Sequence, residues 1–567
     1  MCVGVIGVPR LHPALAGTGS ELLTMELNGS VEAPKENPAP RRSLSSSPGL
    51  QYGALVNSVT SLTTPESQNP PISNRQAYVT MAVLCYINLL NYMERYTIAG
   101  VLLNIQTFFK IRDSTAALLQ TVFICSFLLL APLFGYLGDR YNRKFIMIGG
   151  LCVWLLTAAA SSFVTESYFW LLALLRGLVG IGEASYSTIA PTIIGDLFTG
   201  GKRSIMICIF YIFIPVGSGL GYIAGAGSAY LTGDWHWALR ITPIMGVIGL
   251  ILMIFLCPNP ARGAAETNGE GVVAKSSYLE DIKYLLKNKS YVWSSLGVTA
   301  LAFLTGALAF WVPTFLSRAR VTQELHQPCT DEPCDSTDSY IFGAVTVATG
   351  ILGGAVGTTL SRTFRDKVPY ADPLICGVGM LGSVPCIFII IFVAASSIPA
   401  TYVFIFCGEL LLSLNWAVMA DILLYVVVPT RRATAEALQI SFAHLLGDAG
   451  SPYLIGVISD AVRSSKPDDL NWSFHSLKVS LLVCPFIGIL GGAFFLFTTK
   501  YITEDSKAVL RLIEGNEVLK RRTQNTSMPL RACLSMPTIQ FRSADCKITS
   551  LFILRMVLRK YLLEKKV

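Results

Sequence analysis

The chain has 567 residues, of which 52% are hydrophobic and only 14% are charged, and its mean hydropathy is +0.54. Soluble domains usually contain about one quarter charged residues, so the composition excludes an ordinary soluble protein and favours one that places apolar surface in lipid. The formal net charge of +8 comes from Lys and Arg in short loops between apolar runs. This placement argues against the basic face of a nucleic-acid-binding domain and indicates orientation in a membrane.

The elements predicted in chain order are a polar tail and then a series of membrane-spanning helices. Residues 1–76 are rich in Pro, Ser, Gly and Asn, so we expect a disordered N-terminal tail. Twelve apolar runs follow, each long enough to cross a bilayer as a helix. They lack the alternating pattern of a membrane β-barrel. The runs are 78–101, 115–137, 145–164, 168–190, 204–226, 236–257, 291–316, 339–361, 371–395, 399–427, 435–459 and 477–499.

The distribution of basic residues predicts which side of the membrane each loop faces. With a cytosolic N-terminus, most loop Lys and Arg fall inside, and the outside loops hold only Lys110, Arg112, Arg318, Arg320, Arg463 and Lys466. The positive-inside rule therefore predicts that both termini are cytosolic, in the plasma membrane or an endolysosomal membrane. It also places Cys329 and Cys334 of one polar loop outside, where a local disulfide is expected.

The longest central gap lies between the sixth and seventh runs and divides the chain into two groups of six. Part of this gap, Ser277–Lys287, is short and amphipathic, so we expect a cytosolic linker with a helix at the membrane surface. The predicted organisation is an N-terminal tail over 1–76, a six-helix half over 77–257, a linker over 258–290, a second six-helix half over 291–500 and a cytosolic C-terminal tail over 501–567.

A glycine-rich charged loop joins the second and third runs, with the sequence Gly135-Tyr-Leu-Gly-Asp-Arg-Tyr-Asn-Arg-Lys144. Glycines let two helix ends approach closely, and one acid among several bases can form contacts that break when helices separate. We therefore predict a conformational latch formed by Gly135, Asp139, Arg140, Arg143 and Lys144. The pattern resembles the loop signature of major facilitator transporters, with Asn142 in place of a glycine. The corresponding loop, 357–367, keeps the glycine and the bases but has Ser361 where the acid belongs, so we expect its latch to be weaker.

Charged residues inside the predicted spans are costly to bury in lipid and indicate a functional site. The first span contains Glu94 and Arg95, the fourth contains Arg176 and Glu183, and the tenth contains Glu409. Arg176 and Glu183 are seven residues apart and therefore share one helix face. An arginine can hold an anionic group while a carboxylate exchanges a proton. We predict that these residues form the coupling centre of a transporter.

Several long stretches resemble the spinster branch of the major facilitator superfamily, a branch of sphingolipid and related lipid transporters, over about residues 75–500. The stretches are Leu90–Arg95, Leu119–Cys125, Phe134–Arg140, Arg176–Ile194, Asp234–Arg240, Val428–Thr434 and His444–Gly456. The resemblance implies an all-α membrane protein with the major facilitator fold, twelve transmembrane helices in two six-helix halves. It also implies a secondary active transporter that moves a single-chain lipid with a charged head group by alternating access.

The resemblance also implies roles for individual residues. Glu94, Glu183 and Glu409 are the expected proton-coupling acids, and Glu94 stands where the family usually has Asp. Arg95 and Arg176 are the candidates for binding the head group of sphingosine-1-phosphate or a lysophospholipid. Arg240, at the start of the sixth span, is a further candidate, although a structural ion pair or a position at the membrane interface explains it equally well. An apolar path for the chain is expected from aromatic residues of the seventh and tenth spans, although plain structural packing explains them equally well: Phe303, Phe310, Trp311, Phe406 and Trp416.

Three other functions remain open from the residues alone. A proton-coupled carrier of a small polar solute or organic anion would share the fold and most of the charges. A non-transporting scaffold or receptor would have less use for Arg176 and Glu183. A lipid phosphatase is suggested only by the H-x-x-x-D spacing of His444 and Asp448, without the phosphate-binding motifs that such an enzyme needs. We expect no enzymatic activity, no cofactor or metal, no nucleic-acid partner and a monomer among membrane lipids.

Overall fold

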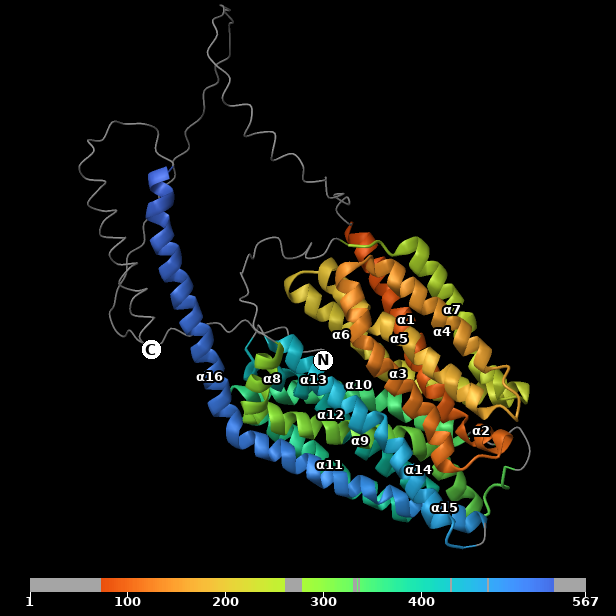
Figure 1. Ribbon diagram of the computed structural model, residues 1–567. Helices are drawn as coiled ribbons and strands as arrows, with labels where there is room; N and C mark the ends of the chain where they lie inside the picture. Colours follow the sequence, from red (N-terminus) through yellow and green to blue (C-terminus); the bar gives the residue numbers. More distant parts are fainter. Residues whose placement is uncertain are drawn as a thin grey trace, which may run out of the picture.

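The computed structural model describes residues 73–260, 278–329, 334, 337–428, 431–466 and 469–534. These parts of the chain are helices joined by short turns (Figure 1). The predicted tail over 1–76 lies almost entirely outside the described residues, as do 261–277 of the predicted linker and the end of the chain after 534.

The N-terminal part of the chain forms a bundle of helices. They are α1 (Asn74–Gly100), α2 (Leu102–Phe109), α3 (Asp113–Arg140), α4 (Arg143–Ser161), α5 (Phe169–Leu197), α6 (Gly200–Thr232) and α7 (His236–Leu256). Six of them coincide with the first six predicted spans. The short α2 was not predicted, and it lies in the connection after α1.

The C-terminal part forms a second bundle. Its helices are α8 (Tyr278–Lys287), α9 (Lys289–Thr322), α10 (Thr337–Arg365), α11 (Ala371–Val393), α12 (Ile398–Val426), α13 (Arg432–Phe442), the π-helical turn η2 (Ala443–Asp448), α14 (Gly450–Arg463), α15 (Leu470–Leu481) and α16 (Val483–Leu534). The last six predicted spans all fall on these helices. The boundary predicted at residue 500 is not a helix end, because α16 continues through it to Leu534.

Ten described helices are long and apolar enough to cross a membrane. The two predicted spans outside this set are also helical. One is α1, in which the buried polar residues Asn88, Asn91, Glu94 and Arg95 interrupt the apolar sequence. The other, 435–459, is divided into α13, η2 and α14. The polar residues of α1 and the π-helical turn η2 make these two spans less apolar or less regular than the others. Both belong to the candidate site described below.

Side-chain caps begin several of the helices. The Ser73 hydroxyl accepts from the Gln76 amide at 3.3 Å, the Asn142 side chain accepts from the Lys144 amide at 3.1 Å, and the Asn288 side chain accepts from the Tyr291 amide at 2.9 Å. Each cap satisfies an amide that has no partner inside its helix. At the other end of α6, Gly233 adopts a φ of 71°, a left-handed conformation that suits a helix C-terminus.

The two bundles meet along α6 with α10 and along α3 with α14 (Figure 1). The sequence between Pro215 and Gly227 of α6 is rich in small residues, which predicts close contact between helices. A Cβ atom added to Gly219 would lie 2.3 Å from the carbonyl oxygen of Gly343, and one added to Gly350 would lie 2.3 Å from Cβ of Pro215. The backbones of α6 and α10 are therefore in direct contact across the interface between the bundles.

One end of this interface is closed by polar contacts, and we call it the sealed end. Asp113 at the start of α3 is 1% exposed and receives both terminal nitrogens of Arg318 from α9, at 2.5 and 2.9 Å. It also accepts from Gln106 at 2.8 Å and from Ser459 of α14 at 2.7 Å. Asp460 in turn accepts the backbone amides of Asp113 and Ser114 at 3.1 and 2.9 Å.

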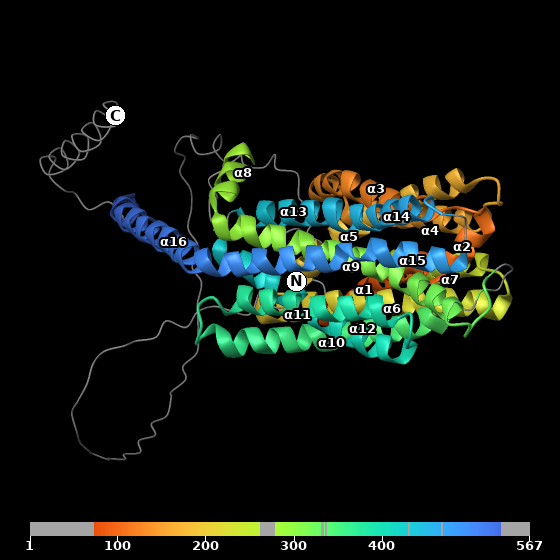
Figure 2. The ribbon, with the colours of Figure 1, turned by 90° about the horizontal axis from the view of Figure 1, so that it is seen from below.

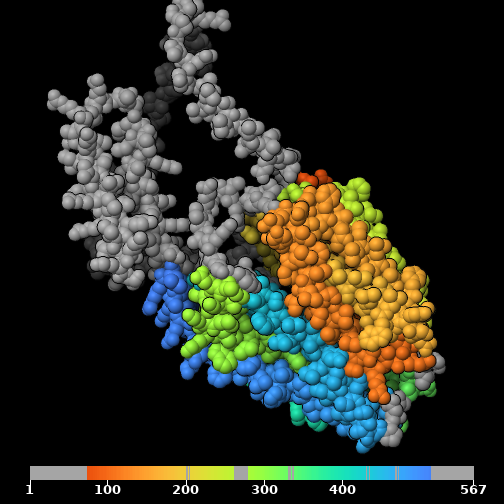
Figure 3. Space-filling model, in the orientation of Figure 1, coloured from red at the N-terminus to blue at the C-terminus, as the bar shows by residue number. Residues whose placement is uncertain are grey.

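The opposite end, which carries the loop from Gly135 to Lys144, is called the open end. Figure 1 shows the axes of the two bundles converging near α2 and α15 and diverging toward α8 and the start of α1. Figure 3 shows the same two halves in contact along one seam. On α3 the side chains of Leu133 and Tyr136 are 48% and 53% exposed, and on α13 that of Phe442 is 54% exposed. α3 packs against α14 and η2, whereas among the described residues α3 and α13 have at most marginal contact. α3 is therefore packed against the second half at the sealed end and separated from α13 at the open end.

The helix α8 lies across the ends of the C-terminal bundle, whereas α16 extends past it (Figure 2). An ion pair of 2.7 Å joins Asp281 to Arg431, and the Asn288 amide donates to the Val426 carbonyl at 2.6 Å. Leu279 and Leu286 are 68% and 67% exposed. This arrangement matches the predicted amphipathic segment, while its contact with a membrane surface stays a prediction.

Candidate functional site

A fully buried ion pair joins α1 to α5 in the N-terminal bundle. Nη1 of Arg176 donates to Oε1 of Glu94, and the two side chains are 0% and 2% exposed. The guanidinium carbon of Arg176 also lies 5.1 Å from the centre of the Phe123 ring. The second Glu94 oxygen and the Arg176 Nε and Nη2 atoms are buried without a hydrogen-bond partner among the described residues. The sequence predicts that these two residues share a site, but not that each neutralises the other.

The neighbouring Arg95 points to the other half of the molecule. Its Nη2 atom lies 3.3 Å from Oδ2 of Asp448 on the π-helical turn η2, with side-chain exposures of 8% and 15%. The same Asp448 oxygen lies 2.8 Å from Nδ1 of His444. These contacts connect the two bundles, and π-helical turns are often found at functional sites.

A small pocket lies beside this connection between the halves. It is lined by Arg95, Tyr96, Ala99, Gln120, Gly306, Phe310 and Asp448. The pocket thus combines a basic group, an acidic group and aromatic surface contributed by both bundles. In this conformation Arg95, rather than the enclosed Arg176, is the arginine that faces the pocket.

The acid Glu183 of α5 is close to these charges and is itself buried. It is 2% exposed, and its Oε2 atom has no hydrogen-bond partner among the described residues. Arg95, Glu94 and Arg176 are all near enough to act on its charge. The structure therefore brings together four of the predicted charged residues, from α1 and α5.

The fifth of the predicted charged residues, Glu409, lies on α12 in the other half. Its two oxygens accept from the hydroxyls of Thr346 at 3.4 Å and Thr349 at 3.0 Å, both on α10. Among the described residues it forms no ion pair or hydrogen bond with the four charges of α1 and α5, although Tyr222 of α6 is close enough for an electrostatic interaction with it. Glu409 is thus a separate acid, held by neutral partners.

Arg240 is not brought together with the other candidate head-group residues. It lies near the start of α7, where Nε and Nη2 donate to the hydroxyl and carbonyl of Ser162 at 3.3 and 3.2 Å. Its guanidinium lies over the rings of Phe163 and Trp237, at 5.1 and 5.0 Å. These contacts hold the start of α7 against the end of α4.

The five predicted tail-binding aromatics fall into different surroundings. Phe310 lines the pocket, and its neighbour Trp311 is fully buried, with Nε1 donating to the Pro452 carbonyl at 3.0 Å. Phe303 is also buried in α9. On α12, Phe406 is half-buried and Trp416 is 39% exposed. Only Phe310 among them lies at the pocket in this conformation.

The predicted latch loop lies at the open end of α3 and α4. Arg143 forms a 2.6 Å ion pair with Asp196 at the end of α5, and Lys144 donates to the Ile254 carbonyl at 2.7 Å. Arg140 lies over the Tyr136 ring at 4.6 Å. Asp139 is exposed, and a Cβ atom added to Gly135 would have no atom within 4 Å. Arg143 and Lys144 thus join α4 to α5 and to α7 within the N-terminal bundle, while Asp139 is exposed.

The corresponding loop of the second half uses acids that the sequence comparison of the two loops missed. Arg365 pairs with Asp372 at 2.8 Å and also with Asp421. Ser361, which stands where the acid was expected, donates to Asp372 at 2.7 Å. Asp372 lies at the start of α11 and Asp421 near the end of α12, so the carboxylates come from outside the loop pattern.

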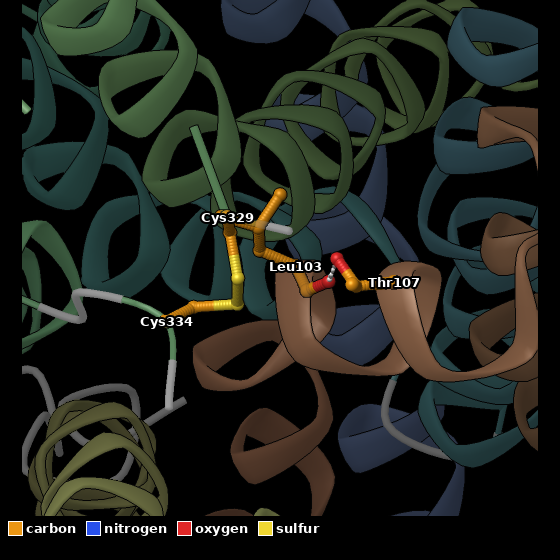
Figure 4. Close-up of a disulfide and its surroundings, with 4 residues drawn as sticks. All are labelled: Leu103, Thr107, Cys329 and Cys334. Atoms are coloured by element: carbon orange, nitrogen blue, oxygen red, sulfur yellow. Dashed lines mark hydrogen bonds between the residues drawn. A yellow bond between two sulfur atoms is a disulfide. The ribbon is translucent and has the colours of Figure 1, made fainter. Parts of the chain in front are cut away.

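A disulfide joins Cys329 and Cys334 in the connection between α9 and α10. Figure 4 shows it beside Leu103 of α2, whose carbonyl accepts from the Thr107 hydroxyl at 3.0 Å. The disulfide of the C-terminal half thus lies beside a helix of the N-terminal half.

Two helical bundles that enclose mid-helix charges define a membrane transporter of the major facilitator class. The sequence model of the Major Facilitator Superfamily matches residues 84–451. Within that superfamily the chain belongs to the spinster family, since it is 65% identical over 481 residues to Protein spinster homolog 3 of Danio rerio, covering 85% of this chain and 96% of the relative. It is 52% identical over 475 residues to Protein spinster homolog 1 of Rattus norvegicus, covering 82% and 90%.

Solved structures support the same fold. A bacterial homolog of the human lysosomal transporter Spinster, in an inward-facing and unoccupied conformation, aligns with a TM-score of 0.67 at 20% identity over 76% of this chain and 99% of that one. A D-xylose-proton symporter aligns with a TM-score of 0.56 at 16% identity, over 74% and 97%. The chain is therefore an integral multi-pass membrane transporter, and the family confirms the expectation that it is not an enzyme.

Proposed function

We propose that the protein moves a single-chain lipid with a charged head group, such as sphingosine-1-phosphate or a lysophospholipid, by proton-linked alternating access. The observation that carries this proposal is the pocket between the halves, where Arg95 stands next to the aromatic surface of Phe310 and Tyr96. A cation beside apolar surface suits a molecule that has an anionic end and a hydrocarbon chain.

The buried acids support a link to protons. Glu183 carries a carboxylate oxygen without a hydrogen-bond partner among the described residues, close to Arg95 and to the Glu94–Arg176 pair. Protonation of Glu183 would remove a negative charge next to Arg95 and change how strongly Arg95 attracts an anion. Arg176 then acts as a positioning residue that fixes Glu94, and Arg95 contacts the head group.

The closed and open ends support alternating access. The seal around Asp113 and Arg318 closes one side, and the separation of α3 from α13 opens the other. We assign the open end to the cytosol, because the basic loops predicted to face the cytosol lie there. On this assignment the two six-helix halves move against each other along α6 and α10, and Asp139 contacts the second half only when the open end closes.

A carrier of a small polar solute is the main alternative within the same fold, as the similarity to a sugar symporter shows that the fold alone does not choose a substrate. The experiment that separates the two is a transport assay with the full chain in proteoliposomes. It compares sphingosine-1-phosphate, a lysophospholipid and xylose, with and without a proton gradient.

In this assay the wild type is expected to move a single-chain lipid, faster with the gradient. Glu183→Gln is expected to keep the fold and lose the effect of the gradient, because the amide cannot exchange a proton. Transport of xylose but neither lipid would contradict the proposed substrate. Transport by Glu183→Gln that still follows the gradient would contradict the proposed role of Glu183.

A further inference from the structure

The contact between Arg95 and Asp448 engages only one of the hydrogen-bond donors of the guanidinium group. It is one contact of 3.3 Å, whereas charge-assisted hydrogen bonds between these groups are usually about 2.7–2.9 Å and often paired. An arginine carries five N–H donors, and the Nε of Arg95 is buried without a partner among the described residues. Arg95 therefore keeps donors that a better-placed anion would engage.

Asp448 has a second partner to which it can move. Its Oδ2 atom is closer to Nδ1 of His444, at 2.8 Å, than to Arg95. The turn η2 that carries both residues is tightly held by α9. A Cβ atom added to Gly447 would lie 2.6 Å from that of Ala302, and one added to Gly306 would lie 2.8 Å from Cα of Asp448. The backbone is thus fixed, and the Asp448 carboxylate has in His444 a partner that would remain if the contact with Arg95 were lost.

The charges around the pocket leave no net positive charge for an arriving anion. Glu94 neutralises Arg176, and Asp448 stands against Arg95. Glu183 adds a further carboxylate near both arginines, and the remaining titratable groups close to Arg95 are the phenols of Tyr92 and Tyr96. A phosphate group that approached Arg95 would therefore find the Asp448 carboxylate already in contact with the guanidinium.

We propose that Asp448 is an internal counter-ion that occupies Arg95 in the empty transporter and that an anionic head group must displace it toward His444. Asp448 is then a specificity-determining residue, because it weakens the binding of phosphate-bearing lipids and leaves uncharged lipids unaffected. This inference rests on the proposed function, in which Arg95 receives the head group. A simple brace between the two halves would hold Asp448 in the same position, but its removal would affect all ligands alike.

The test measures binding of two lipids that share one chain, oleoyl lysophosphatidic acid and monooleoylglycerol, to the full-length protein in nanodiscs. Asp448→Asn is expected to bind the phosphate lipid about fivefold more tightly or better, with the uncharged lipid unchanged. Asp448→Glu keeps the charge and should show no gain. Asp366→Asn makes the same charge change at an exposed position between α10 and α11, so it should leave both affinities unchanged. Thermal unfolding checks that each variant is folded.

A double variant separates competition from a change in conformation. In the Arg95→Gln background, Asp448→Asn should bring no gain, because there is no longer a cation to release. A gain that persists there, an equal gain for both lipids, or no gain for the phosphate lipid would overturn the inference. The proposed function fails separately, if Arg95→Gln alone keeps the wild-type preference for the phosphate lipid. Failure of every variant to bind either lipid would contradict both.

Discussion

The two halves of this transporter share a helical plan but differ in how they hold buried charge. In the N-terminal half, Glu94 and Arg176 form an ion pair with almost no solvent exposure, beside the buried acid Glu183. In the C-terminal half, Glu409 is held only by the hydroxyls of Thr346 and Thr349. The difference indicates that the first half carries a buried ion pair between two of its own helices, whereas Glu409, the candidate coupling acid of the second half, has neutral hydroxyl partners.

The largest effect is expected from breaking the buried pair in the first half. Arg176→Gln leaves Glu94 buried without its cation, which typically costs about 3–5 kcal/mol. Thermal unfolding in detergent should show this loss, and lipid transport should be abolished. The double variant Arg176→Gln with Glu94→Gln removes both charges and should recover most of the stability. A double variant that is as unstable as the single one would show that the pair is not the source of the loss.

A smaller effect is expected where the two halves meet at the sealed end. Arg318→Gln removes the cation from Asp113, and losing one partner of such a buried pair costs about 2–5 kcal/mol. The closed conformation of this end should become less populated. Labelling of an introduced Ser317→Cys by a maleimide that does not cross membranes should then be faster from the sealed side.

The matched control for this prediction is Arg320→Gln on the same helix. Arg320 pairs with Asp338 at 2.8 Å, and both belong to the second half, so their contact does not join the halves. Its loss should leave the labelling rate close to that of the wild type. Equal labelling rates in the two variants would mean that the Asp113–Arg318 contact does not keep the sealed end closed.

The smallest effect is expected in the second half. Glu409→Gln keeps an amide oxygen that accepts from the same threonines, and no cation is left unpaired, so the stability should change by less than about 1 kcal/mol. Thermal unfolding of Glu409→Gln and Arg176→Gln, measured side by side, compares the loss of stability in the two variants. A loss as large as that of Arg176→Gln would remove the proposed difference between the halves.

The helices and the charged positions could be predicted from the sequence, because apolar runs and charges inside them are local features. The partners of those charges could not. Arg95 meets Asp448, which is 353 residues away, and Arg143 meets Asp196 rather than the Asp139 of its own loop. Asp113 of the sealed end lies two residues before a predicted span and was not singled out, because nothing near it in the sequence points to Arg318.

One useful signal in the sequence lies at His444 and Asp448. The two residues are four positions apart within a predicted span, and they were interpreted as the spacing of a phosphatase motif and as part of a stretch that resembles the spinster family, but not as an ion-pair site. Their spacing falls on the π-helical turn η2, whose extra residue per turn no periodicity argument would reveal. Helix breaks of this kind depend on tertiary packing. Here Gly306 of α9 and Gly447 of η2 allow the two segments to approach closely.

The most direct test of alternating access is a pair of distance measurements by electron paramagnetic resonance in nanodiscs. One pair of spin labels, at the exposed residues Tyr136 and Phe442, spans the open end, and another, at the exposed residues Arg112 and Ser464, spans the sealed end. When a transported single-chain lipid is added, the first distance should shorten in part of the molecules and the second should lengthen in the same fraction. Distances that stay fixed at both ends while transport proceeds would contradict the account.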